Sequence, residues 1–288
     1  MNLSWLLEPF SYPFMQRGLV VAIVVGILCA VIGCYVVLRS MAFLGDALAH
    51  AILPGVAVAY LLGGNLLLGA LVAAVVVALG IAFFSRGGLI KEDTAIGILF
   101  AAALSLGIAL ISAIRAYAVD LSHILFGNIL GVSPSDMLLV IILSAIVLAI
   151  LIAFYRPFLV ISFDPILAQT LRMPGGLVRS VLLILLAVTI VISMQTVGIG
   201  LVAAMLVTPG AAAYLLTRRL PAMMALAAVF GAISSLVGLY ASYYLNIASG
   251  AAIVLSATLI FLLAFFFAPQ RGLVWARFRS HSRQKAAS

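Results

Sequence analysis

The chain has 288 residues, of which 67% are hydrophobic and 8% are charged, and its mean hydropathy is +1.38. Soluble domains carry about 25% charged residues. This composition therefore excludes a soluble domain with a single anchor and predicts an all-α polytopic membrane protein. The net charge of +8 comes from 15 basic and 7 acidic residues. We attribute it to the basic bias of membrane loops, and we expect no nucleic-acid partner.

Nine apolar stretches are each long enough to cross a bilayer, which takes about 20 residues. In chain order they lie at 18–38, 44–62, 66–84, 95–114, 137–155, 178–194, 197–216, 222–245 and 249–267. The sixth and seventh stretches are close together around Gln195 and could merge, so eight spans is the alternative. Together these stretches predict one transmembrane domain over residues 1–269.

The basic residues predict the orientation of the chain. With the N-terminus outside, 13 of the 15 basic residues fall in cytoplasmic connections or in the C-terminal tail. The positive-inside rule favours this arrangement, so we expect an N-out, C-in topology. Residues 270–288 then form a basic cytoplasmic tail that can lie against anionic lipid headgroups.

Two connections between the predicted spans are longer than a turn. The outer one, 115–136, contains His123 and is too apolar for a free loop, so a short re-entrant or interfacial helix fits it. The cytoplasmic one covers 156–179. In it Asp164 followed by Pro165 is typical of a helix start, and Pro174 is expected to end that helix. A short amphipathic helix in a cytoplasmic loop suits a docking element.

Asp46 and His50 carry the strongest chemical signal. Asp46 is the only acidic residue between positions 18 and 84, and His50 follows it four residues later. Helical residues four apart share a face, so the carboxylate and the imidazole point the same way. Ionisable groups inside a membrane tend to mark ion routes. One oxygen and one nitrogen ligand suit a divalent transition metal, which predicts a metal path through the membrane.

The alternative interpretation is structural: Asp46 caps the second helix and His50 is a packed histidine. Two ligands from one chain do not complete a metal shell. Two copies around an axis would bring two aspartates and two histidines together, a set that suits Mn²⁺, Fe²⁺ or Zn²⁺ held transiently. His123 is a weaker ligand candidate, because a lone histidine in an interfacial helix is more often structural.

The chain lacks the parts of an enzyme. No Gly-x-x-x-x-Gly-Lys-Ser/Thr phosphate-binding loop is present, and three histidines with few acids leave no nucleophile–base pair. We expect neither catalysis nor a permanently bound cofactor, only a transported metal ion.

Four segments resemble the permease subunit of bacterial ABC importers for manganese, zinc and iron. They are 35–55 (YVVLRSMAFLGDALAHAILPG), 120–128 (DLSHILFGN), 162–165 (SFDP) and 197–209 (VGIGLVAAMLVTP). The resemblance covers most of the chain, and the first segment is highly specific. It implies a type II ABC importer-like permease in the bacterial cytoplasmic (inner) membrane. It also implies a second copy of the permease, two cytoplasmic ATP-binding subunits and an extracytoplasmic metal-binding protein.

The resemblance also assigns roles to residues. The positions of Asp46 and His50 would form the metal site in the translocation path. The loop 156–179 would hold the coupling helix that seats in the ATPase, through Phe163, Asp164, Pro165, Leu167 and Ala168. The segments from Thr208 to Ala211 and from Tyr214 to Leu216 look more like manganese or iron permeases than zinc ones.

Manganese import is therefore the expected function, with zinc or ferrous iron as the alternative cargo. A proton-coupled secondary transporter, in which Asp46 and His50 relay protons, is a second class. The capped helix of the cytoplasmic loop argues against it, since such a transporter has no partner to dock. A non-transporting membrane scaffold is a third class, and it predicts that changes at Asp46 or His50 affect stability alone.

Overall fold

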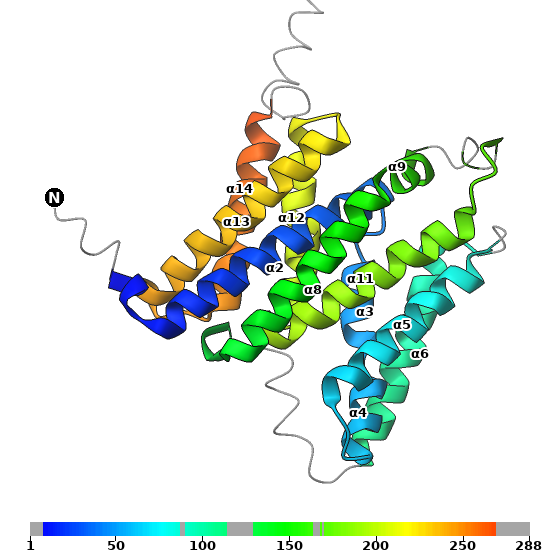
Figure 1. The fold of residues 1–288 in the computed structure, drawn as a ribbon, viewed down its shortest axis with the longest axis horizontal. Coiled ribbons are helices and arrows are strands. Elements are labelled where there is room, and N and C mark those ends of the chain that lie inside the picture. The colour runs from blue at the N-terminus through cyan, green and yellow to red at the C-terminus, as the bar shows by residue number, and fades with distance from the viewer. Residues whose placement is uncertain (1–7, 87–89, 114–128, 164–167, 169, 269–288) are drawn as a thin grey trace, which may run out of the picture.

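The computed structural model describes residues 8–86, 90–113, 129–163, 168 and 170–268 (Figure 1). Helices make up its regular structure, and no strand occurs in these ranges. In chain order they are η1 (Glu8–Ser11), α2 (Pro13–Leu38), α3 (Leu44–Ala51), α4 (Leu53–Leu61), α5 (Leu66–Phe84), α6 (Glu92–Ser112), η3 (Ile129–Gly131), α8 (Pro134–Ala153), α9 (Tyr155–Phe163), α11 (Gly175–Val197), α12 (Ile199–Leu216), α13 (Leu220–Leu245) and α14 (Ser249–Phe267).

The predicted spans correspond to these helices. Within the described ranges, 8 helices are long and apolar enough to cross a membrane, with α3 and α4 counted as one, and Gly200–Leu216 forms a shorter apolar helix. The sixth and seventh predicted spans do not merge. They are separate helices, α11 and α12, because the chain breaks at Gly198. Its φ of 87° is left-handed, a conformation that glycine adopts without steric cost.

The second predicted span is broken in the middle. α3 ends at Ala51 and α4 begins at Leu53, next to Pro54. Proline has no N–H and its ring clashes with the carbonyl four residues earlier, which is that of His50. The Ile52 N–H reaches the His50 carbonyl instead. The break therefore lies directly after the turn that carries Asp46 and His50.

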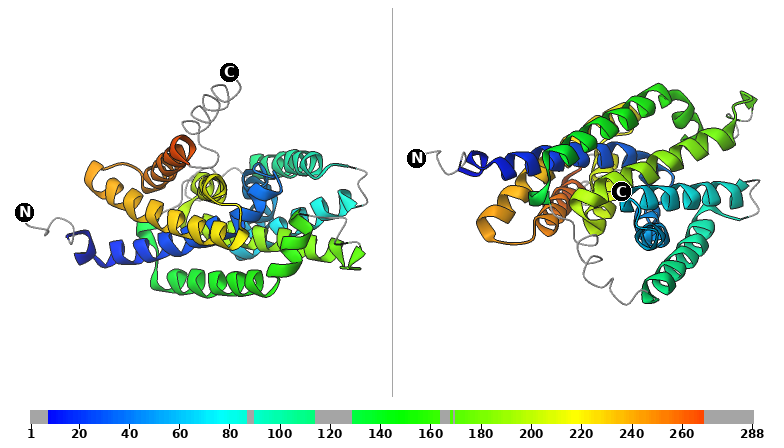
Figure 2. Two further views of the ribbon diagram at one scale, coloured as in Figure 1. Left: turned by 90° about the horizontal axis from the view of Figure 1, so that it is seen from above. Right: turned by 60° about the horizontal axis from the view of Figure 1, so that its bottom comes forward.

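Helix α2 is the centre of the bundle. It packs against α8, α12 and α13 (Figures 1 and 2), so the first helix of the chain meets elements from its last third. Contact with α12 is close at Gly33, where a Cβ would overlap the Leu206 carbonyl. Ser235 of α13 donates a hydrogen bond of 2.8 Å to the Ala22 carbonyl of α2. Small residues and interhelical hydrogen bonds are the usual means of packing helices in lipid.

A second group of helices lies beside this bundle. α5 packs against α4 and α11, while α6 covers α3 and α4 (Figure 1). α4 and α5 meet at Gly55 and Gly69, where a Cβ on either glycine would overlap the other's carbonyl. Helix α3 links the two groups, since it contacts α6 on one side and α12 on the other.

Basic residues gather at one end of the described bundle. They lie in the connections that follow α2, α5, α8 and α12 and near the starts of α6 and α11. These residues are Arg39, Arg86, Lys91, Arg156, Arg172, Arg179, Arg218 and Arg219. At the opposite end the described chain has only Arg17. By the positive-inside rule the arginine-rich end is cytoplasmic, as the N-out, C-in topology requires. The predicted basic tail at 270–288 lies outside the described residues.

Candidate metal site

Asp46 and His50 lie on α3, the short first half of the broken span. Helix α3 begins at Leu44 after Phe43, so Asp46 occupies the third helical position and not the N-cap. Within the described residues its carboxylate accepts no backbone hydrogen bond. The capping role that the sequence left open is therefore not the one that Asp46 performs here. Its negative charge in the first turn still suits the helix dipole.

The two side chains face each other along one side of α3. His50 Nε2 lies 3.6 Å from Asp46 Oδ1, and the side chains are 29% and 44% exposed respectively. That separation exceeds a good hydrogen bond. It is close to the spacing of two ligand atoms held about 2.1 Å from one tetrahedral metal ion. The pair is therefore spaced and exposed as metal ligands would be, and neither group has another ion-pair or hydrogen-bond partner among the described residues.

Aromatic rings from a neighbouring helix adjoin the imidazole. The Phe100 ring of α6 lies 6.2 Å from the His50 ring, centre to centre, and 5.4 Å from the Phe43 ring. These rings limit the orientations open to His50 on one side. They also lower the local polarity, which strengthens electrostatic attraction between a cation and the Asp46 carboxylate.

One chain supplies only part of a metal shell. Among the described residues, no group of three or more His, Cys, Asp or Glu side chains lies close enough to hold one ion. Metals that prefer imidazole and carboxylate take four to six ligands. Further ligands must come from outside this described part of the chain, from water, or from a second copy.

The other predicted site residues lie partly within and partly outside the described ranges. His123 lies outside the described residues, as do Asp164, Pro165 and Leu167. Phe163 is the last residue of α9 and is 58% exposed, whereas Ala168 is buried. Residues 168 and 170 are helical, and α11 begins after Pro174. Helix α9 itself, which precedes the predicted coupling helix, was not expected from the sequence.

A second polar cluster, also not expected, ties four helices together at the cytoplasmic end. Glu92, the first residue of α6, accepts a hydrogen bond of 3.1 Å from Arg39 and one of 2.8 Å from Arg179. Arg179 also donates to the carbonyl and hydroxyl of Ser85. The cluster thereby joins the ends of α2 and α5 to the starts of α6 and α11. Burial lowers the pKa of Arg39 from its usual value, and Glu92 offsets part of this shift.

Comparison with known proteins identifies the family. The model of the ABC 3 transport family matches residues 11–268. The chain belongs to this family.

Relatives of this ABC 3 chain are similar over nearly their whole length. "Manganese transport system membrane protein MntC" of Halalkalibacterium halodurans is 50% identical over 274 residues, which cover 95% of this chain and 94% of that protein. A Haemophilus influenzae chain named "Probable iron transport system membrane protein" is 40% identical over 272 residues, covering 94% and 96%.

Solved structures show the same fold. PsaBC from Streptococcus pneumoniae in complex with Fab matches with a TM-score of 0.82 and 41% identity, covering 94% of this chain and 98% of that one. The ABC 3 chain is accordingly a multi-pass ABC permease of the bacterial cytoplasmic membrane.

Proposed function

We propose that this protein is the permease subunit of an ATP-driven importer of Mn²⁺, in which Asp46 and His50 of two copies line the metal path. The observation that carries the proposal is the pair itself. A carboxylate and an imidazole 3.6 Å apart remain partly exposed on a broken membrane helix. Ionisable groups at such a position are costly, and transport gives them a function.

The chemistry of the pair suits a transported ion. Imidazole and carboxylate bind divalent first-row metals, and neither holds them as tightly as thiolates hold softer ions. A conducting site must bind its ion weakly enough to release it. When two copies join, each contributes only two ligands to the ion. Neither copy alone holds a complete shell, so the ion can be released when the copies move apart.

A homodimer completes the site. In a symmetric dimer the same patch of both copies meets itself, so two Asp46 and two His50 side chains would converge on the axis. Mixed oxygen and nitrogen ligands of this number suit Mn²⁺, Zn²⁺ or Fe²⁺. His50 must be neutral to ligate, so acid conditions are expected to weaken occupancy.

Energy would come from separate subunits. The sequence has no phosphate-binding loop. We assign ATP hydrolysis to two cytoplasmic partners that seat against the 156–179 connection. The exposed Phe163 side chain at the end of α9 offers them an apolar contact. An extracytoplasmic binding protein would deliver the ion, and the two halves would then alternate between outward-facing and inward-facing states.

Manganese is favoured by the relatives. A protein named for manganese transport is 50% identical to this chain, whereas one named for iron is 40% identical. Ferrous iron and zinc remain the alternative cargo, because their ligand preferences overlap with those of manganese. A proton-coupled secondary transporter is a weaker alternative, since this chain belongs to the ABC 3 transport family.

The test is uptake of radiolabelled Mn²⁺ into cells that express the full system. We expect Asp46→Asn and His50→Ala each to reduce uptake more than about ten-fold at normal membrane levels, because the first removes the charge of one ligand and the second removes the other ligand. Asp93→Asn is the matched control, since Asp93 is an exposed carboxylate at the start of α6. Near wild-type uptake in either ligand variant would reject the metal path. Strong inhibition by excess Zn²⁺ would keep the path and change the cargo.

A further inference from the structure

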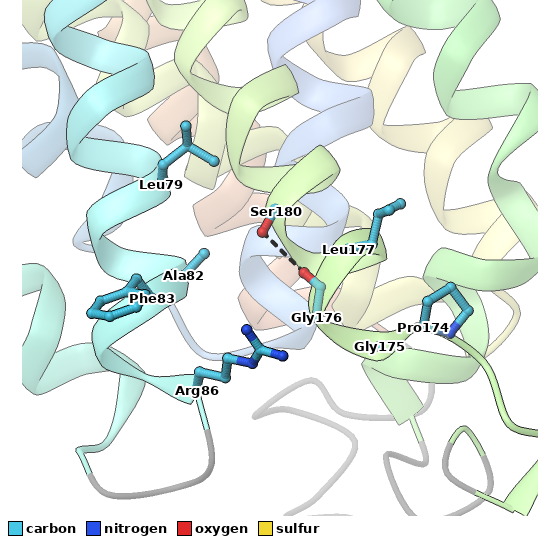
Figure 3. A pocket seen from close by; sticks show the side chains of 9 residues that line it. All are labelled: Leu79, Ala82, Phe83, Arg86, Pro174, Gly175, Gly176, Leu177 and Ser180. Carbon is cyan, nitrogen blue, oxygen red and sulfur yellow. Dashed lines mark hydrogen bonds between the residues drawn. The ribbon is translucent and has the colours of Figure 1, made fainter.

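A groove of about 800 Å³ opens between α5 and the first turn of α11 at the cytoplasmic end of the described bundle (Figure 3). Its walls are mainly apolar and include Leu79 and Phe83 of α5 and Leu177 of α11. Its polar residues are Arg86, just beyond α5, and Ser180 of α11. The groove is therefore amphipathic, with an apolar length and a cationic end.

The apolar wall of the groove is continuous with a surface that faces lipid. Five residues of α5 are 43–70% exposed and recur every three or four positions: Leu68, Val72, Val76, Leu79 and Phe83. This spacing places them on one face of the helix, and a membrane helix turns such a face to acyl chains. Leu79 and Phe83 belong both to this face and to the groove. The groove thus opens sideways toward the hydrocarbon of the cytoplasmic leaflet.

Arg86 is the polar group in the groove that is available to a ligand. Its side chain is exposed and has no hydrogen bond or ion pair to the described residues. The other two candidates nearby are already engaged. Ser180 donates its hydroxyl to the Gly176 carbonyl at 2.9 Å, and Arg179 turns inward to Glu92 and Ser85. In Figure 3 the Arg86 guanidinium extends toward the first turn of α11, across the mouth of the groove.

We propose that this groove binds an anionic phospholipid of the cytoplasmic leaflet. The headgroup phosphate pairs with Arg86, and one acyl chain lies along Leu79, Phe83 and Leu177. Guanidinium groups bind phosphate through paired N–H donors. The groove lies at the level of the cytoplasmic leaflet, which carries anionic lipids. Its positive charge therefore suits the headgroups found at that level. Space for a ligand extends to the start of α11, where a Cβ on Gly176 would meet no atom within 4 Å.

The experiment measures lipids that stay bound to the full-length permease in its membrane complex. The complex is purified from nanodiscs made of equal parts phosphatidylglycerol and phosphatidylcholine, and retained lipids are counted by native mass spectrometry. We expect the wild type to retain phosphatidylglycerol preferentially. Arg86→Gln should lower that preference about five-fold, the contribution of one basic residue near an anionic surface. Arg86→Lys should keep most of the preference.

Two further variants separate the groove from general charge. Gly176→Trp places a ring in open space within the groove and should displace the lipid while Arg86 remains. Arg219→Gln removes an exposed cation at the same end of the bundle but outside the groove, and should leave retention unchanged. Equal losses in Arg86→Gln and Arg219→Gln would overturn the proposal. Displacement of the lipid by millimolar inorganic phosphate would also overturn it, since the site would then be a phosphate site. None of these outcomes depends on metal uptake.

Discussion

The Asp46–His50 pair and the Glu92 cluster are two ways of placing charge in an apolar protein. Each oxygen of Glu92 accepts a hydrogen bond from an arginine, and its side chain is 18% exposed. Asp46 is 44% exposed, and among the described residues it meets only His50, beyond hydrogen-bond distance. A carboxylate that is fully paired holds helices together. One that is left half-paired is available to a cation.

The two regions are connected through helix α6. Glu92 begins this helix, and Phe100 lies two turns further along beside His50. The cluster therefore fixes the helix that supports the imidazole, while the ligands themselves sit on α3. This arrangement predicts that the cluster acts on stability and the pair acts on transport. The following predictions can break or sharpen that distinction.

The largest effect is expected at Asp46. Asp46→Asn keeps the size of the side chain and removes its charge, so Mn²⁺ uptake should fall more than about ten-fold. The midpoint of thermal unfolding in detergent should stay within a few degrees of the wild type, because Asp46 makes no structural hydrogen bond with the described residues. A large fall in that midpoint would show that Asp46 belongs with Glu92 as a structural group.

Glu92→Gln should have the reverse profile. Two arginines would lose their counter-charge, and breaking a buried ion pair costs about 3–5 kcal/mol. Since Glu92 is 18% exposed, we expect about 2–3 kcal/mol and a lower unfolding midpoint. Uptake per folded molecule should remain near normal. Loss of uptake with unchanged stability would contradict the structural role of the cluster.

Arg179→Gln should cost less than Glu92→Gln, because Arg39 would still pair with the carboxylate. The change removes the bonds from Arg179 to Glu92 and Ser85, worth about 1–2 kcal/mol. Combining it with Glu92→Gln should cost less than the sum of the two, since both disrupt one network. Additive losses in denaturation measurements would show that the two residues act independently.

The smallest effect is expected at Phe100. Phe100→Leu keeps an apolar side chain but removes the ring beside His50, so the Mn²⁺ concentration for half-maximal uptake should rise about two- to five-fold. Phe267→Leu, at the exposed end of α14, is the control and should change nothing. An unchanged half-maximal concentration in Phe100→Leu would show that the imidazole is oriented by other groups.

Sequence reasoning predicted the helices well because a bilayer imposes a length and an apolar composition on each span. It placed Asp46 and His50 on one helical face, which the 3.6 Å separation bears out. It did not predict the break at Ile52, although Pro54 was a usable signal. Helix α9 was missed because residues 156–163 were assigned to the cytoplasmic connection that begins at the basic Arg156.

The Glu92 cluster was beyond reach of the sequence. One of its ion pairs joins residues that are 53 positions apart in the sequence, and the other joins residues that are 87 positions apart. No local sequence pattern specifies such pairing. Arg39 and Arg179 each fit the positive-inside rule, and Glu92 fits the start of a helix. Because each residue is explained separately, nothing in the sequence marked the three as one unit. The metal role of the Asp46–His50 pair, and its completion by a second copy, stay predictions because they depend on contacts between chains.

The central position of α2 has a consequence for how the protein is made. Ribosomes add about 5–20 residues per second, and roughly 160 residues separate the end of α2 from the start of α12. Helix α2 therefore waits on the order of ten seconds or more before its main partners, α12 and α13, are made. Its residues are mostly apolar on every side of the helix, which suits a helix surrounded by lipid. Helices α12 and α13 are thus made well after α2 and must find it within the bilayer once they are inserted.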